Sequence, residues 1–261
     1  MNTGAQKKPK AAVVLSGCGV FDGTEIHEAV ITLLCLLKGG AEVSFFAPDI
    51  RQSDCINHLD GSDSEGPRNV LSESARIARG KIEPLSRFDA GKFDMLLFPG
   101  GFGAAKNLCT FAYDGADCTI EPSVEKAISE MIGKGGKIAF MCISPVIGAK
   151  AIGDGVMLTI GNDKQTASAI EAAGAKHIPC AVDSFLEDKS KNVYSTPAYM
   201  LAKDAAEVEK GVSAMISRMF ETLYYGVWHY KGATVRGCCI GRVFRAAVAC
   251  SKNDDYVARN R

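Results

Sequence analysis

One cysteine lies where the sequence pattern is typical of a reactive thiol. The apolar run 138–141 ends at Cys142, and Ser144-Pro145 then opens a segment of helical character. A strand, a sharp turn and a helix start would place the Cys142 thiol at the carboxyl end of a strand and beside helix N–H groups. That environment favours the thiolate. The alternative is a buried structural cysteine, because free cysteine is among the most buried residue types.

Two acids lie at the start of the first helical segment and are candidates for handling a proton. Glu25 and Glu28 begin the range 25–38, whose apolar residues recur at helical spacing. A carboxylate within hydrogen-bond reach of a thiol can hold or exchange its proton. The alternative for Glu25 is a first-turn acid that stabilises the helix dipole, and both interpretations remain open.

A glycine-rich turn, Pro99-Gly100-Gly101-Phe102-Gly103, follows another apolar run. It lacks the Gly-Lys-Ser/Thr ending of a phosphate-binding loop, so nucleotide binding is not expected. The backbone N–H of Gly101, together with that of Ile143, is instead a candidate oxyanion hole facing the Cys142 sulfur. The alternative for these glycines is a plain tight turn that binds nothing.

Other chemically active residues give weaker signals. Cys18, in Ser16-Gly17-Cys18-Gly19, is the second candidate nucleophile because it also ends an apolar run. We interpret the four histidines, His27, His58, His177 and His229, as surface or loop residues, since none directly follows Cys142 and a Cys-His pair would need distant parts of the chain to meet. No cysteines or histidines share ligand spacing, so we expect no metal site and no cofactor.

The periodicity predicts short buried strands that alternate with helices, as in a doubly wound α/β fold with a mostly parallel sheet and helices on both faces. The expected strands are 11–15, 42–47, 94–98, 138–141, 157–160, 177–182 and 192–195, and the expected helices are 25–38, 69–79, 122–134, 146–152, 163–173 and 205–223. Ligands of such sheets bind at the carboxyl ends of the strands. We therefore expect the loops 16–22, 99–103 and 141–145 to meet at one site.

Composition limits the classes of function. The chain has 261 residues, with 30 basic and 30 acidic side chains, so no nucleic-acid partner is indicated. The longest apolar run is too short to span a membrane. Ten scattered cysteines without a signal peptide favour a reducing compartment. We divide the chain into a disordered lead-in at 1–10, one domain at 11–223 and a divergent tail at 224–261.

Several long motifs resemble those of one protein family. They include Phe-Pro-Gly-Gly-Phe-Gly-Ala-Ala-Lys-Asn-Leu at 98–108, Met-Cys-Ile-Ser-Pro at 141–145 and Thr-Pro-Ala-Tyr-Met at 196–200, with further matches at 15–28, 47–49, 68–71 and 75–80. In these stretches the chain resembles the enhancing-lycopene-biosynthesis (ElbB) proteins. These belong to the class I glutamine amidotransferase-like group, which also includes the Parkinson-associated deglycase and the PfpI proteases.

The resemblance implies a flavodoxin-like fold with Cys142 at a nucleophile elbow and Glu28 in contact with it. Bacterial members of the family are described as cofactor-independent glyoxalases, and vertebrate members as mitochondrial. The sequence departs from the hydrolytic relatives in two places, because Ile143 follows the cysteine and Thr196 occupies the late strand end, where those enzymes use a histidine. The absence of these histidines argues against glutamine hydrolysis and proteolysis, and an ammonia-producing amidotransferase subunit is the third option, which would need a histidine that the sequence does not supply in the expected places.

The leading functional hypothesis is a glyoxalase-like enzyme that converts glyoxal or methylglyoxal to a hydroxy acid through Cys142. The alternative is a non-catalytic or redox-sensing protein with an oxidisable Cys142. The expected partners are a small carbonyl substrate and, as an option, a second copy of the chain in a homodimer, with no nucleic acid and no membrane. The resemblance indicates a mitochondrial location. A chain that starts at Met1 without a transit peptide would be cytoplasmic.

Overall fold

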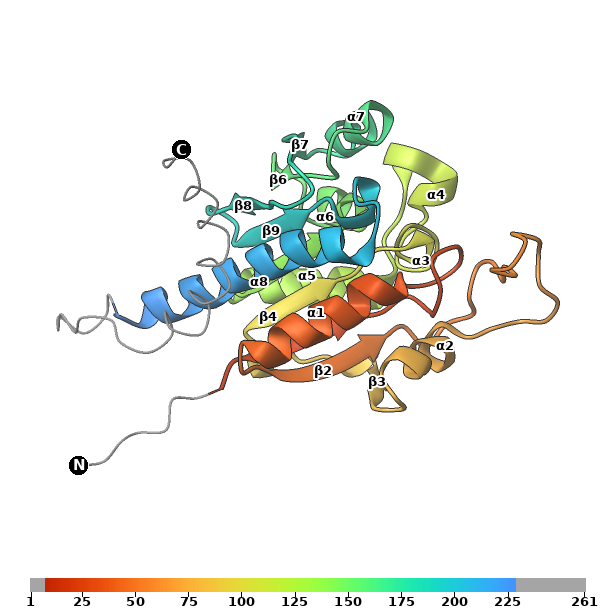
Figure 1. Ribbon diagram of the computed structural model, residues 1–261, viewed down its shortest axis with the longest axis horizontal. Coiled ribbons are helices and arrows are strands. Elements are labelled where there is room, and N and C mark those ends of the chain that lie inside the picture. The colour runs from red at the N-terminus through yellow and green to blue at the C-terminus, as the bar shows by residue number, and fades with distance from the viewer. Residues whose placement is uncertain (1–7, 229–261) are drawn as a thin grey trace, which may run out of the picture. The chain divides into compact units, whose positions relative to one another are not determined.

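The computed structural model describes residues 8–228, with side chains described as far as Leu223, and it is built on a seven-stranded sheet (Figure 1). The strand order is β3-β2-β1-β4-β5-β9-β8, and every neighbouring pair is parallel except β8 with β9. The strands are β1 Lys10–Val14, β2 Glu42–Ala47, β3 Ile82–Pro84, β4 Met95–Phe98, β5 Lys137–Met141, β8 Leu186–Asp188 and β9 Val193–Thr196. This arrangement confirms the flavodoxin-like, mostly parallel fold class.

Helices pack on both faces of the sheet. Figure 1 shows α1 and α8 side by side across one face. The α-helices are α1 Ile26–Lys38, α2 Val70–Ile77, α3 Phe102–Lys106, α4 Phe111–Asp114, α5 Pro122–Gly133, α6 Pro145–Ile152, α7 Lys164–Ala172 and α8 Ala205–Trp228. Short 3-10 turns are η1 Leu85–Arg87, η2 Ala90–Lys92, η3 Gly115–Asp117 and η4 Ala198–Met200. A separate two-stranded sheet pairs β6 Met157–Leu158 with β7 Lys176–His177.

The central strands form because they are continuous apolar runs, as strands covered on both faces must be. All four residues of β4 and all five of β5 are buried. Across these strands the rings of Phe98 and Phe140 stack with centroids 5.2 Å apart. Gly148 of α6 lies against this stack, since a Cβ there would fall 2.7 Å from the Phe140 ring. The stack therefore fixes α6, and with it the turn that carries Cys142, on the sheet.

The structure corrects several expectations about local structure. Lys10, expected in the lead-in, already belongs to β1. The expected strand 177–182 reduces to β7, because its partner is only the two-residue β6. The sequence pattern missed β3, β8 and α3, all of five residues or fewer, which are too short to show a period.

The chain divides into two compact units, 1–223 and 224–261. The helix α8 continues beyond the expected end of the final helix as far as Trp228. The expectations for residues 1–7 and for the tail from 229 onward lie outside the described residues. Among the helices described, none is long and apolar enough to cross a membrane.

Truncating the ring that anchors α6 should destabilise the fold. We expect Phe140→Ala to lower the free energy of unfolding by about 3–5 kcal/mol, because it removes a fully buried ring and leaves a cavity. The control is Leu59→Ala, whose side chain is 92% exposed and whose effect should stay within about 0.5 kcal/mol. Urea denaturation measures both. Equal midpoints for wild type and Phe140→Ala would contradict the assigned packing.

Candidate active site

Cys142 lies on a strained turn between β5 and α6. Its backbone φ is +58°, in the left-handed region that residues other than glycine, asparagine and aspartate rarely adopt. Its N–H donates to the carbonyl of Thr196 at 3.1 Å, which ties the turn to the end of β9. A strained strand-to-helix turn is the geometry of a nucleophile elbow. The backbone therefore presents the thiol at the carboxyl edge of the sheet.

Ser144 holds the other side of this turn. Its fully buried hydroxyl accepts from the N–H of Met141 at 2.8 Å and lies 2.7 Å from the carbonyl of Phe98, to which it donates. The turn is thus bonded to β4 on one side and to β9 on the other. Backbone strain of this kind persists only where the surroundings over-determine it, and these bonds supply that constraint.

Glu28 reaches the thiol from the first turn of α1. The side chain is completely buried, and it lies near enough to Cys142 for each group to shift the pKa of the other. One carboxyl oxygen accepts from the N–H of Gly100 at 2.7 Å, and the other accepts from the N–H of Tyr199 at 3.3 Å. The contact between Glu28 and Cys142 thus depends on three segments far apart in sequence.

Gly100 is required where the strand-end loop passes between these two groups. A Cβ at this position would fall 2.5 Å from the Cβ of Cys142 and 2.9 Å from Oε2 of Glu28. Any side chain there would separate the acid from the thiol. The next residue, Gly101, has φ +94°, so the turn also needs glycine for its conformation.

Burial raises the pKa values of both Glu28 and Cys142. Burial, opposed by the Gly100 N–H and assisted by the charge of Glu25, raises the pKa of Glu28 from 4.5 to about 7. Burial and the neighbouring Glu28 carboxylate raise the pKa of Cys142 well above its usual value. The sequence-based expectation of a thiolate is therefore wrong for this closed site. Desolvation outweighs the helix N–H groups that the pattern pointed to.

The two expected oxyanion donors lie beside the sulfur. The N–H groups of Gly101 and Ile143 both interact with Cys142 and oppose the rise in its pKa. They are thus directed at the position where negative charge would develop during attack by the thiol. Their role in stabilising an oxyanion stays a prediction.

The secondary candidates have other surroundings. Glu25 is the N-cap of α1, and its side chain accepts from the N–H of Glu28 at 2.7 Å. It therefore orients the helix that carries Glu28 and adds negative charge nearby. Cys18 is half-buried, and burial and the charge of Glu73 raise its pKa. Its charged neighbours, Glu73 and Arg76 in α2 and Asp22 in its own loop, are different from the groups around Cys142.

Sequence reasoning missed the contribution of the 196–200 segment. Ala198 has φ +44°, and this kink turns the Tyr199 N–H toward Glu28. The Tyr199 hydroxyl in turn lies 2.7 Å from Nδ1 of His27, on the exposed side of α1. The available signal was the Thr-Pro-Ala-Tyr motif itself, which carries part of the family resemblance but does not indicate a contact with Glu28.

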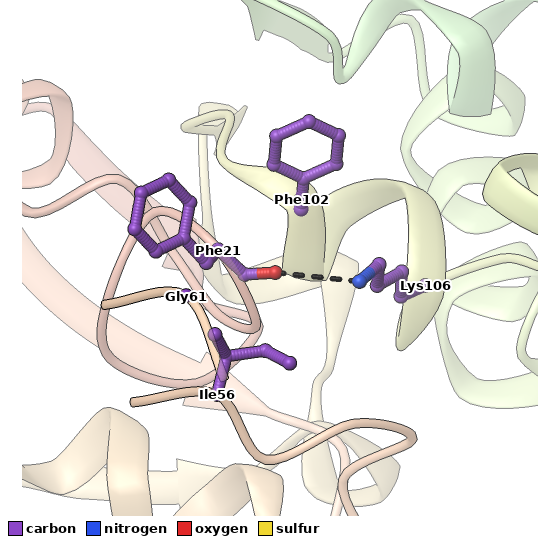
Figure 2. Close-up of a pocket in the computed structure, with 5 residues that line it drawn as sticks. All are labelled: Phe21, Ile56, Gly61, Phe102 and Lys106. Carbon is purple, nitrogen blue, oxygen red and sulfur yellow. Dashed lines mark hydrogen bonds between the residues drawn. The ribbon is translucent and has the colours of Figure 1, made fainter. Parts of the chain in front are cut away.

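An open pocket of about 250 Å³ lies against the first turn of α3, and Figure 2 shows its lining by Phe21, Ile56, Gly61, Phe102 and Lys106. The Lys106 ammonium donates to the carbonyl of Phe21 at 3.4 Å and pairs with Asp54 at 2.5 Å. None of the lining residues is among the individually predicted site residues, but Phe21 and Phe102 belong to two of the loops expected to meet at the site. Within the described part of the chain, no three His, Cys, Asp or Glu side chains cluster as metal ligands.

The raised pKa of Glu28 should make stability depend on pH. A folded-state pKa of about 7, above the ordinary 4.5, means that this group's contribution is fully present below about pH 4.5 and is lost as the pH rises through 7. We expect wild type to lose up to about 3 kcal/mol relative to Glu28→Gln between pH 4.5 and 8. Urea denaturation at several pH values measures this difference.

The control for this experiment is Glu42→Gln, which removes an exposed carboxyl group. It should leave the pH dependence of wild type unchanged. A constant difference in stability between wild type and Glu28→Gln across this pH range would show that Glu28 has an ordinary pKa.

Comparison with known sequences finds close relatives in vertebrates. No family model matches the chain. It is 47% identical over 223 residues to the human glutamine amidotransferase-like class 1 domain-containing protein 3, mitochondrial, covering 81% of this chain and 82% of the relative. It is 46% identical over 224 residues to the rat ES1 protein homolog, mitochondrial, covering 82% and 84%. Both names agree with the expected mitochondrial location.

Solved structures agree with these relatives. An isoprenoid biosynthesis protein with amidotransferase-like domain from Ehrlichia chaffeensis superposes with a TM-score of 0.78 at 34% identity, covering 82% of this chain and 99% of that one. A ThiJ/PfpI domain protein from Brachyspira murdochii, at 15% identity and a TM-score of 0.52 over 84% and 99%, shares the fold. The chain therefore belongs to the family of ES1 proteins and their glutamine amidotransferase-like class 1 relatives.

Proposed function

We propose that the protein is a cofactor-independent glyoxalase-like enzyme acting on small dicarbonyls such as glyoxal and methylglyoxal. Membership of the amidotransferase-like family is compatible with a cysteine-based activity. The observation that carries the finer proposal is the buried pair of Cys142 and Glu28, in which the acid has a pKa of about 7. A base whose pKa lies near neutrality exchanges protons efficiently at neutral pH.

The first step is addition of the thiol to one aldehyde carbon. A bond forms between the Cys142 sulfur and this carbon, while the thiol proton passes to the Glu28 carboxylate. The N–H groups of Gly101 and Ile143 hold the carbonyl oxygen as it becomes negative. Proton return to that oxygen gives a hemithioacetal and restores the carboxylate. A protonated thiol is no obstacle here, because its base lies beside it.

Isomerisation and hydrolysis complete the reaction. The Glu28 carboxylate removes the C–H proton of the hemithioacetal carbon and delivers it to the neighbouring carbonyl carbon, by way of an enediol. The first carbon is thereby oxidised to a thioester, and the second is reduced to an alcohol. Water then cleaves the thioester, which releases glycolate or lactate and regenerates the Cys142 thiol. No external oxidant or reductant is needed.

Two features of the site support this class of substrate. Cys142 is only 8% exposed, which favours molecules of two or three carbons over a peptide or a larger amide. The groups that interact with its sulfur are Glu28, Gly101 and Ile143, and none is a histidine. A hydrolase of the amidotransferase type needs a general acid to protonate a leaving amine, whereas the isomerisation above needs one base that exchanges its proton.

Redox sensing by Cys142 is the alternative function. It requires an accessible thiol of lowered pKa, because oxidation follows thiolate character and exposure. Burial and the raised pKa of Cys142 act against both requirements. Selective modification of Cys142 by mild peroxide, without turnover of any dicarbonyl, would favour redox sensing over the glyoxalase-like activity.

Removing the nucleophile should abolish turnover. We expect Cys142→Ala to lower the rate of glycolate formation from glyoxal by at least about 10³-fold, since no other group replaces the covalent step. The matched control is Cys18→Ala, which removes the other strand-end thiol and should retain most of the activity. Glycolate is measured by chromatography. Equal rates for wild type and Cys142→Ala would exclude the proposed mechanism.

Removing the base should change the pH profile as well as the rate. In wild type we expect kcat/KM to rise as the pH increases through about 7, because Glu28 must be ionised to accept the thiol proton. Glu28→Gln should lower kcat/KM by about 10²–10⁴-fold and remove this rise. A Glu28→Gln enzyme that kept the wild-type profile would show that another group is the base.

A further inference from the structure

Two cysteines that the proposed glyoxalase reaction does not use flank one surface loop. Cys109 lies between α3 and α4, and Cys118 directly follows η3, so the segment 110–117 leaves one cysteine and returns to the other. The middle of this segment, 112–114, is exposed. Both cysteine side chains are buried, at 2% and 0% exposure. The loop therefore covers two thiols whose role is not explained by the chemistry at Cys142.

The backbone pairs the two ends of this loop. An isolated antiparallel bridge joins Cys109 to Ile120, and the N–H of Thr110 donates to the carbonyl of Thr119 at 3.0 Å. Cys118 is two residues before Ile120 and has an extended backbone, so its side chain lies on the same face of the pair as that of Cys109. Residues in this relation are diagonal neighbours across an antiparallel pair. The fold therefore brings the two thiols together.

The surroundings of the two thiols favour ionisation of Cys118. The Cys109 thiol lowers the pKa of Cys118, burial opposes this effect, and the Lys150 ammonium lowers the pKa further against the charge of Asp114. Lys150 is held at the loop, since its ammonium donates to the carbonyl of Ala116 at 3.3 Å. A thiolate is the form of cysteine that attacks an oxidant, and a neighbouring cation favours it. Cys118 is thus the nucleophile of the pair.

Cys109 is placed to act second. Its thiol donates to the carbonyl of Ala104 in α3 at 3.4 Å, and the Cys118 thiol and burial raise its pKa, so it keeps its proton. A thiol next to an oxidised cysteine resolves it as a disulfide.

Burial also limits which oxidants reach the pair. The residues on either side of Cys118, Asp117 and Thr119, are exposed, so its sulfur lies directly beneath the surface. A molecule as small as hydrogen peroxide reaches such a sulfur when the covering loop opens locally, whereas a bulky disulfide such as oxidised glutathione needs a thiol that is already exposed. The oxidant that fits the pair is therefore a small hydroperoxide.

We propose that Cys109 and Cys118 form a redox-active dithiol, which hydrogen peroxide oxidises to a disulfide within the chain. The Cys118 thiolate attacks one peroxide oxygen, which breaks the O–O bond, forms a sulfenic acid and releases hydroxide. The Cys109 thiol then attacks the Cys118 sulfur, so that an S–S bond forms and water leaves. The hydroxide takes up the proton that Cys118 lost on ionisation. In all, the two sulfurs are oxidised by two electrons, and the peroxide is reduced to two molecules of water.

A peptide map of the oxidised full chain tests the disulfide. Trypsin cleaves after Lys106 and Lys126 and leaves both cysteines in the single peptide 107–126. The chain is treated with hydrogen peroxide at a dose that leaves its circular dichroism unchanged, then denatured and alkylated. We expect the peptide to lose two hydrogen atoms and its alkylation to fall by at least about 10-fold, because both thiols are consumed. Dithiothreitol should restore the alkylation. A peptide that stays fully alkylated would overturn the proposal, whichever other cysteine is oxidised.

Single substitutions test the two roles. In Cys109→Ser the sulfenic acid at Cys118 has no resolving thiol, so dimedone should trap it there. In Cys118→Ser we expect at least about 10-fold less dimedone at Cys109, because this thiol keeps its proton. The matched control Cys55→Ser removes a half-buried thiol elsewhere and should form the disulfide as wild type does. Trapping at Cys109 in place of Cys118 would overturn the assigned roles. The wild-type map requires neither variant to fold, and no readout depends on the glyoxalase assay.

Discussion

The close approach of the buried Glu28 carboxyl to the Cys142 thiol, on either side of Gly100, is the constraint around which the site is arranged. A buried carboxyl group is unfavourable unless other groups satisfy its oxygens. Here the loop after β4 supplies the Gly100 N–H and the segment after β9 supplies the Tyr199 N–H. These loops have little freedom to move apart, because each satisfies part of the same acid. The parallel sheet serves to bring their ends to one edge.

The same constraint explains both the backbone strain at Cys142 and the raised pKa of its thiol. The turn at Cys142 is held in the left-handed region by Thr196 and Ser144 from either side, which leaves the sulfur facing Glu28. Exclusion of water then raises the pKa values of both partners. At neutral pH the Cys142 thiol therefore keeps its proton, and the Glu28 carboxylate beside it is the group that can accept this proton. This differs from the exposed thiolate of redox-active cysteines.

The candidate site could largely be located from the sequence, but its chemistry could not. Cys142 and Gly101 follow buried strands, so the rule for ligand sites in parallel sheets brings them together. Glu25 and Glu28 were both candidates from their place at the start of a helix, and the family resemblance selected Glu28. The sequence did not indicate Tyr199, because its contribution is a backbone N–H, which almost any residue type carries. The direction of this N–H depends on the kink at Ala198. Short elements such as β3 and β8 could not be predicted either, because a segment of three residues shows no hydrophobic period.

The sequence by itself determined the alternation of the longer strands and helices and the identity of the strand-end loops, because these follow from local spacing. Only the tertiary structure decided that Cys142 is a protonated thiol and that Glu28 titrates near 7. The reason is that a pKa depends on how completely distant segments exclude water from a group, and the glycine that lets acid and thiol approach, Gly100, is 72 residues from Glu28 in the chain. It likewise decided that Glu28 and Thr32 of α1 point inward, because helical spacing alone does not say which face of a helix packs on the sheet.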